Sequence, residues 1–147
     1  MANVQDVANY LLFLDQQEAD EEVGNISNLK LQKLAYYAQG FFAALNDGKP
    51  LFESRIEAWT HGPVVVELYH QYKGFGANPI PFDEKSGFDL ADEEADLIQE
   101  VFQVFSQFSP WKLRNMTHEE SPWLNHSSEA GEIPVDEMAE YFKTRLK

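Results

Sequence analysis

The chain has 147 residues, of which 44% are hydrophobic and 14% aromatic, a composition that can bury a domain-sized core and excludes a disordered tail. Its 25 acidic and 11 basic residues give a formal net charge of −14, which disfavours nucleic-acid binding because that binding depends on Lys and Arg. The absence of cysteine excludes disulfides, thiolate catalysis and cysteine-based zinc sites.

The first predicted element is an amphipathic helix over residues 3–18, where apolar residues recur at helical spacing. Its apolar run at residues 11–14 is far too short to span a bilayer, and residues 1–25 contain no Lys or Arg. We therefore expect a soluble, cytoplasmic protein with no signal segment and no membrane partner.

The second predicted element is a helix that begins at an N-cap formed by Ser27 or Asn28 and ends before Gly48. Apolar residues at steps of three and four give it a stripe that faces the core. Gly40 interrupts its middle, where Gly costs about 1 kcal/mol relative to Ala. We expect another element to approach the helix closely at that point.

A short strand and a third helix follow. Alternating apolar and polar residues with a Trp predict the strand at residues 56–60. The run His61-Gly62-Pro63 predicts the start of a helix, with Pro63 at its first position and Gly74 at its end.

The remainder of the chain predicts a long loop and several helices. Gly and Pro residues exclude regular helix from residues 74–90, and so long a loop is often functional. Asp92, Ser109 and Ser121 are each expected to cap a helix, the two serines with a proline directly after them. The last helix is predicted to begin near Pro134.

Together these elements predict a mainly α fold. We expect a single compact helical domain over residues 1–147, with about six or seven helices. A minor short β element is expected at residues 56–60, with a second β segment at residues 131–133. No repeat of solenoid period and no interdomain linker divides the sequence.

Candidate catalytic and metal-binding groups form no recognisable motif. The four histidines lack the spacing of a helical zinc site, and no glycine run could hold a phosphate. Capping explains Ser27, Ser109 and Ser121, and none of them lies in a strand–turn–helix elbow. We therefore expect no catalytic residue, no metal and no cofactor.

Lys30 and Lys33 lie three residues apart near the start of the second helix, where the helix dipole disfavours cations. One interpretation is a solvated face, with local pairing to Glu21 or Glu22. The other is a small positive island on a negative surface, available to an acidic loop of a partner. The sequence leaves both open.

Three sequence runs occur in an order that resembles a known family. They are residues 28–40 (Asn-Leu-Lys-Leu-Gln-Lys-Leu-Ala-Tyr-Tyr-Ala-Gln-Gly), residues 57–65 with His61-Gly62-Pro63-Val64-Val65, and residues 117–123 with Ser121-Pro122-Trp123. The ordered set resembles the Panacea domain family, the SocA-like antitoxins once described as phage-associated proteins. The resemblance extends from about residue 4 to about residue 125.

The resemblance implies a largely helical domain that is the antitoxin of a bacterial or prophage toxin–antitoxin pair. Such proteins neutralise unrelated toxins by direct protein–protein binding, so the implied partner is a cognate toxin encoded nearby. One alternative is a proteolytic adaptor that delivers the toxin to a Clp-type protease. Another is a hydrolytic enzyme using His61, His118 and nearby carboxylates, although we expect a protein that is not an enzyme.

Partner contacts are expected on exposed faces and at the 74–90 loop, because one scaffold serves many toxins. Five residues are predicted to lie near the contact region: Lys30, Lys33, Tyr37, Trp59 and His61. The acidic surplus has two interpretations, solubility alone or complementarity to a basic partner. Six acids and no base precede residue 25, and such a surface could occupy the basic cleft of a toxin that acts on nucleic acid.

Overall fold

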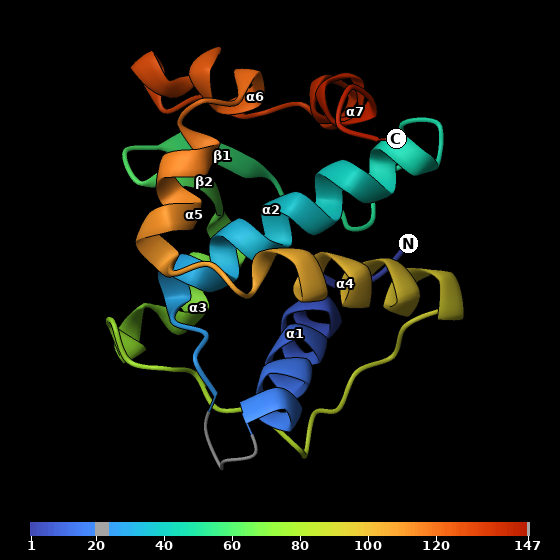
Figure 1. Ribbon diagram of the computed structural model, residues 1–147, viewed down its shortest axis with the longest axis vertical. Coiled ribbons are helices and arrows are strands. Elements are labelled where there is room, and N and C mark those ends of the chain that lie inside the picture. Colours follow the sequence, from blue (N-terminus) through green and yellow to red (C-terminus); the bar gives the residue numbers. More distant parts are fainter. Residues whose placement is uncertain (20–23, 147) are drawn as a thin grey trace.

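Helix α2 (Asn28–Leu45) runs through the middle of the molecule, and the other elements pack around it (Figure 1). The computed structural model describes residues 1–19 and 24–146. Of the 18 residues of α2, 15 are buried, so it is covered on nearly every side. A surface helix would bury only one stripe of its side chains. Helix α2 is therefore more completely buried than the apolar stripe in its sequence predicts.

The other elements surround α2 in a mainly α arrangement, which confirms the predicted fold class. In chain order they are α1 (Val4–Ala19), β1 (Ile56–Trp59), β2 (Gly62–Val65), α3 (Val66–Tyr72), the 3₁₀ helix η1 (Lys73–Phe75), α4 (Asp92–Phe105), α5 (Pro110–Thr117), α6 (Ser121–Leu124), the 3₁₀ helix η2 (Ser127–Glu129) and α7 (Val135–Lys143). A bridge between Glu57 and Glu132 adds the second predicted β segment. None of the described helices is long and apolar enough to cross a bilayer.

The chain after β1 forms a second strand, and the prediction of a helix beginning at Pro63 is wrong. Strands β1 and β2 pair antiparallel with Trp59 opposite Gly62, so residues 60–61 form a two-residue turn. Valines that follow the proline favour extended pairing, and α3 begins only at Val66. The proline is tolerated because β2 pairs only with β1 and is therefore an edge strand. A φ of +105° after the turn explains the glycine there.

Two of the predicted helix caps are also wrong. Ala91 rather than Asp92 occupies the N-cap of α4, where its backbone N–H donates to the Glu94 carboxylate at 2.8 Å. Glu120 rather than Ser121 occupies the N-cap of α6, and no side chain caps that helix. The predicted caps at α2 and α5 are confirmed, because each serine accepts a hydrogen bond from the backbone N–H three residues on.

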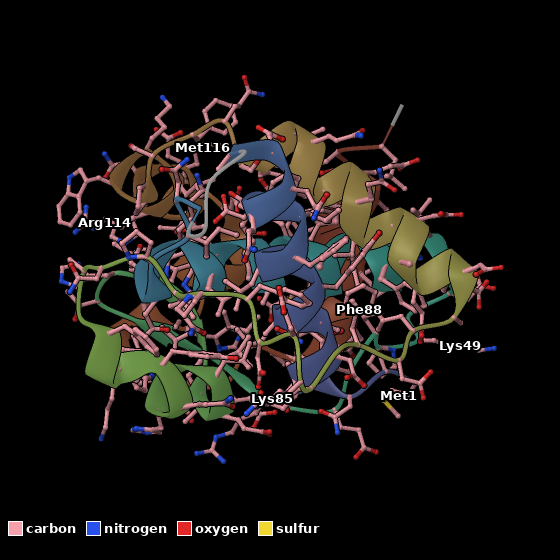
Figure 2. All side chains as sticks on the ribbon, turned by 90° about the horizontal axis from the view of Figure 1, so that it is seen from below. Met1, Lys49, Lys85, Phe88, Arg114 and Met116 are labelled. Atoms are coloured by element: carbon pink, nitrogen blue, oxygen red, sulfur yellow. The ribbon has the colours of Figure 1, made fainter. Side chains whose placement is uncertain are left out.

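The segment between η1 and α4 contains no helix or strand over residues 76–91, which agrees with the loop predicted at residues 74–90. It lies across α1 (Figure 2). The Asn9 side chain of α1 donates to the carbonyl oxygen of Gly87, and Phe88 packs against aromatic rings of the same helix. The loop is therefore fastened to the body of the molecule.

Gly40 allows α7 to approach α2, as its position within the helix predicts. A Cβ built on Gly40 would lie 2.2 Å from Cδ2 of Phe142. Phe142 is fully buried, and its ring meets that of Tyr36 edge-on with 5.5 Å between centroids. The glycine is thus required by packing.

We predict that Gly40→Ala lowers the free energy of unfolding. Overpacking costs about 1–3 kcal/mol, whereas the better helix propensity of Ala returns about 1 kcal/mol, and a 2.2 Å contact places the cost at the upper end. Urea unfolding measures the difference. Gly74→Ala is the control, because a Cβ at Gly74 meets nothing within 4 Å. Equal stability of both variants would contradict the packing argument.

Candidate functional site

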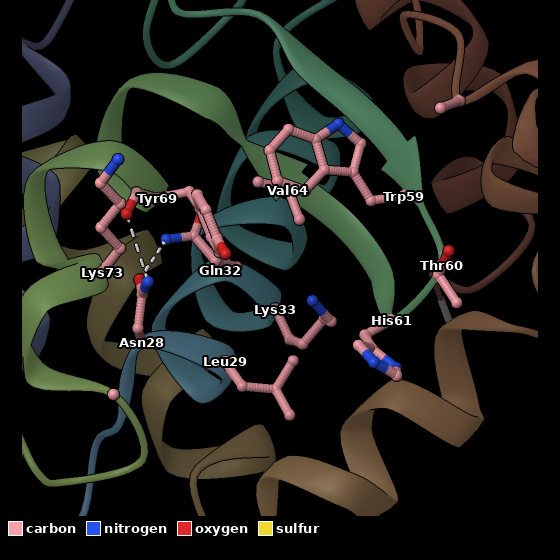
Figure 3. A pocket seen from close by; sticks show the side chains of 12 residues that line it. Asn28, Leu29, Gln32, Lys33, Trp59, Thr60, His61, Val64, Tyr69 and Lys73 are labelled. Carbon is pink, nitrogen blue, oxygen red and sulfur yellow. Dashed lines mark hydrogen bonds between the residues drawn. The ribbon is translucent and has the colours of Figure 1, made fainter.

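A pocket of about 660 Å³ opens where the start of α2 meets the β1–β2 turn and α3 (Figure 3). Its lining is Asn28, Leu29, Gln32, Lys33, Trp59, Thr60, His61, Val64, Tyr69, Lys73, Gly76 and Ala130. Two lysines and a histidine belong to this lining, and no Asp or Glu of the described residues does. The chain has 25 acidic residues, so a pocket whose charged side chains are lysines is unusual in it.

An amide network shapes one side of the pocket (Figure 3). The Gln32 side chain donates to Oδ1 of Asn28 at 2.7 Å and accepts from the backbone N–H of Val65 at 2.9 Å. Nδ2 of Asn28 donates to the carbonyl oxygen of Tyr69 at 3.3 Å. These bonds join α2, β2 and α3, so the two amides hold the wall in shape.

Lys33 forms the other side of the pocket although it is 0% exposed. Its Nζ donates to the carbonyl oxygen of Pro63 at 3.0 Å, and no salt bridge among the described residues includes it. Burial, together with the positive charge of Arg114, lowers the pKa of Lys33 from 10.5 to about 7. The ammonium is therefore buried with only a neutral acceptor beside it.

Two helices fasten the β1–β2 turn above this lysine. From α2, the Lys33 stem passes so close that a Cβ on Gly62 would lie 2.6 Å from Cε of the lysine. From α6, the indole N–H of Trp123 donates to the carbonyl oxygen of Trp59 at 2.7 Å. The Trp123 ring also stacks on His118, with 3.8 Å between centroids and 7° between planes. The three sequence runs singled out above therefore meet at this turn.

Basic side chains gather around the turn. Nε of Arg114 donates a hydrogen bond to Nδ1 of His61 at 3.4 Å, and Arg114 is seen at the edge of the molecule in Figure 2. Burial lowers the pKa of His118, as do the positive charges of Arg114, Lys33 and His61, while a backbone hydrogen bond with Thr60 acts in the opposite direction. These like charges repel one another in a part of the surface that would be stabilised by an anion.

Of the five residues predicted near a partner, three line the pocket and two do not: Lys33, Trp59 and His61 line it, whereas Lys30 and Tyr37 are buried elsewhere. His61 is exposed in the turn. Trp59 is half-buried, and its indole N–H donates to the Glu57 carboxylate at 2.8 Å.

Lys30 and Lys33 are both buried, so the interpretation of the pair as a solvated face is wrong. Contact of Lys33 with an acidic group of a partner stays a prediction, because Lys33 lines the pocket. Lys30 is 5% exposed, and its Nζ donates to the carbonyl oxygen of Ser106 just after α4. Burial lowers the pKa of Lys30, while the negative charges of Asp15 and Glu18 raise it. The predicted partners at residues 21 and 22 lie outside the described residues.

Tyr37 belongs to a buried cluster around Glu120. The hydroxyl groups of Tyr36 and Tyr37 donate to the two oxygens of this carboxylate at 2.9 and 2.8 Å, and NH1 of Arg145 lies 3.4 Å from it. Burial raises the pKa of Glu120, whereas the hydrogen bonds from Tyr37, Tyr36 and Arg145 lower it. The cluster ties α2 to the start of α6 and to the end of α7, so Tyr37 serves the fold.

The pocket offers charge and aromatic walls but no nucleophile paired with a base. The described residues contain no cluster of three His, Asp or Glu that could hold a metal ion. The hydrolase alternative needs a carboxylate beside His61 and His118, and the described lining supplies none. This arrangement is suited to binding.

A second hollow, of about 470 Å³, lies between α2, α4 and the C-terminal residues. Its walls are mostly apolar, with Leu45 56% exposed and Val104 52% exposed. It lacks the concentration of basic groups seen at the turn, with Arg145 and Glu100 as its charged residues. We call it the apolar groove.

Comparison with known proteins finds a family model that matches most of the chain. The family model described as "Antitoxin SocA-like, Panacea domain" matches residues 31–124. The protein "Antitoxin SocA" of Caulobacter vibrioides (strain NA1000 / CB15N) is 45% identical over 55 residues, which are 37% of this chain and 29% of that relative. No solved structure matches.

We predict that Lys33→Met removes a pH dependence of stability. Below about pH 7, Lys33 is charged in the folded protein, and the unfavourable effect of burying its ammonium on stability is then at its maximum. Between about 7 and 10.5 only the unfolded chain binds the proton, so the free energy of unfolding rises with pH, by at most about 1.4 kcal/mol per unit. Met keeps the stem without the charge, and its stability advantage over the wild type should therefore shrink as pH rises from about 6 to 9.

Urea unfolding of both proteins across this pH range measures that advantage. Because all other titrating groups are shared, subtracting the two profiles isolates Lys33. A difference that stays constant with pH would contradict a buried, uncompensated ammonium.

Proposed function

Because the chain belongs to the Antitoxin SocA-like, Panacea domain family, we propose that it is the antitoxin of a toxin–antitoxin pair and neutralises its toxin by direct binding. The cognate toxin is encoded nearby, and neutralisation takes place in the cytoplasm without catalysis. We also propose that residues 1–147 act as one domain. Helices α1 and α7, which lie outside the matched range, support this because both pack on α2.

The observation that carries the proposed binding mode is the turn between β1 and β2. It is fastened to α2 and α6 by the hydrogen bonds of Lys33 and Trp123, while Thr60 and His61 at its tip are exposed. A surface held rigid before binding loses little conformational entropy when a partner docks. The turn and its pocket are therefore our proposed contact region.

Within this region we propose that Lys33, Trp59 and His61 lie near the partner, as the sequence predicts. Trp is among the residues that contribute most to binding energy at interfaces, and Trp59 lies half-buried at the pocket wall. Lys30 and Tyr37 act in this proposal through the scaffold, because both are buried and hydrogen-bonded to other elements.

The acidic surface gives the proposal a second component. A net charge of −14 attracts a basic toxin over a distance of about one Debye length, roughly 8 Å at physiological salt. Such attraction accelerates association more than it slows dissociation. The association rate with a basic toxin should therefore fall as salt is raised.

We predict that Lys73→Glu weakens toxin binding and rescue of growth. Lys73 is exposed and lines the pocket, so reversing its charge changes the proposed contact region without disturbing the core. The neighbouring open reading frame is expressed with this gene, and growth and co-purification are measured. We expect at least about a tenfold loss of affinity, which corresponds to 1.4 kcal/mol.

Lys49→Glu is the matched control, because Lys49 is equally exposed but follows the far end of α2. Failure of the unmodified gene to rescue growth from any neighbouring product would contradict the antitoxin proposal. Loss of the toxin from cells, in place of a stable complex, would favour the adaptor for a Clp-type protease. Rescue that survives Lys73→Glu but is lost in Val104→Glu would move the contact region to the apolar groove.

A further inference from the structure

The basic groups around the β1–β2 turn lack an anion among the described residues. Lys33 is wholly buried beside the carbonyl oxygen of Pro63 and forms no salt bridge there. Nδ1 of His61 accepts a hydrogen bond from Nε of Arg114 at 3.4 Å, so the guanidinium reaches the turn through His61. Lys73 adds a further positive charge to the lining. Acidic residues are plentiful in the chain, yet none of the described ones lines this pocket.

A buried ammonium without a counter-ion is costly to the fold. Removing a charge from water is unfavourable, and a backbone carbonyl offsets only part of that penalty. Nearby positive charge increases the penalty, since Arg114 acts on Lys33 and both act on His118. An anion in the pocket would remove this penalty, so the protein gains stability by binding one.

Apart from the amide wall of Asn28 and Gln32, the remaining walls of the pocket are largely apolar. The rings of Trp59 and Tyr69 meet at 67° with 4.9 Å between centroids, and both line the cavity. The side chains of Leu29 and Val64 complete these walls. A volume of about 660 Å³ falls in the range of small-molecule sites.

We propose that this pocket binds a carboxylate carried on a flat apolar body. The carboxylate lies between Lys33 and His61, and the body lies against Trp59 and Tyr69. One buried ammonium matches the single charge of a carboxylate. Because Lys33 is 0% exposed, the carboxylate reaches its ammonium only when side chains at the turn move, and Thr60 and His61 there are exposed.

The same chemistry has two sources, a free organic acid and a carboxylate-bearing segment of a partner protein. The proposal does not depend on the antitoxin role, since a probe compound tests the pocket in the isolated protein. Competition with a partner then distinguishes the two sources.

Sodium benzoate is the probe, and benzamide is its uncharged control of nearly equal shape. Both are titrated into ¹⁵N-labelled protein at about pH 6, where Lys33 is protonated, with ionic strength held constant by sodium chloride. We expect saturable shifts from benzoate at the Trp59 indole, His61 and Gly62. Benzamide and acetate should each bind at least about tenfold more weakly, since one lacks the charge and the other the body.

Lys33→Met should reduce benzoate affinity to the level of benzamide, and it is expected to fold because it removes a buried charge. Lys30→Met is the matched control, because Lys30 is a lysine on the same helix that is 5% exposed and faces Ser106. Raising the pH to about 9 should weaken benzoate binding to the wild type, as Lys33 loses its proton.

Three results would overturn the proposal: shifts that do not saturate, equal affinity for benzamide, and unchanged affinity in Lys33→Met. If they are absent, benzoate is added to the complex with the toxin. Displacement of benzoate assigns the natural carboxylate to the toxin, and simultaneous binding assigns it to a free acid. Loss of toxin neutralisation without loss of benzoate binding would refute the proposed function alone.

Discussion

The hydrogen bond from Lys33 to the carbonyl oxygen of Pro63 is the constraint on which this structure depends most. It joins the most buried helix to the turn of the hairpin, and the lysine stem fills the space that only a glycine at position 62 leaves open. Trp123 holds the same turn from the opposite side through the carbonyl oxygen of Trp59. The turn is thus rigid while its tip reaches solvent, which is the arrangement that a binding surface requires.

Charge separates the molecule into two kinds of surface. Acidic side chains dominate the sequence, whereas the basic groups near the turn come from α2, η1 and α5 and converge in space. The buried Glu120 carboxylate accepts hydrogen bonds from two tyrosine hydroxyl groups and is paired with Arg145. The Glu120 charge is therefore compensated within the fold. The ammonium of Lys33 at the pocket has only a backbone carbonyl beside it.

The helices could be predicted from the sequence because their apolar periodicity and caps are local, and Gly40 predicted the approach of another element. The burial of Lys33 could not, since charged residues three apart usually indicate a solvent-facing surface and only the hairpin reveals what covers them. The error at Pro63 has a similar origin: a proline after glycine is typical of a helix start, but pairing with β1 decides the outcome. Asn28 and Gln32, four residues apart, lie on one face of a helix, and this spacing is a local signal of the polar wall.

Direct measurement of the Lys33 side-chain pKa tests the central claim that this ammonium lies buried without a counter-ion. Lysine labelled with ¹³C at Cε and ¹⁵N at Nζ is followed by NMR from about pH 5 to 11, and Lys33→Met assigns the signal. The account predicts a midpoint near 7, well below the ordinary 10.5. A midpoint at or above 10 would show that an acidic group or solvent compensates the charge. It would contradict the claim that the pocket contains a buried ammonium without a counter-ion.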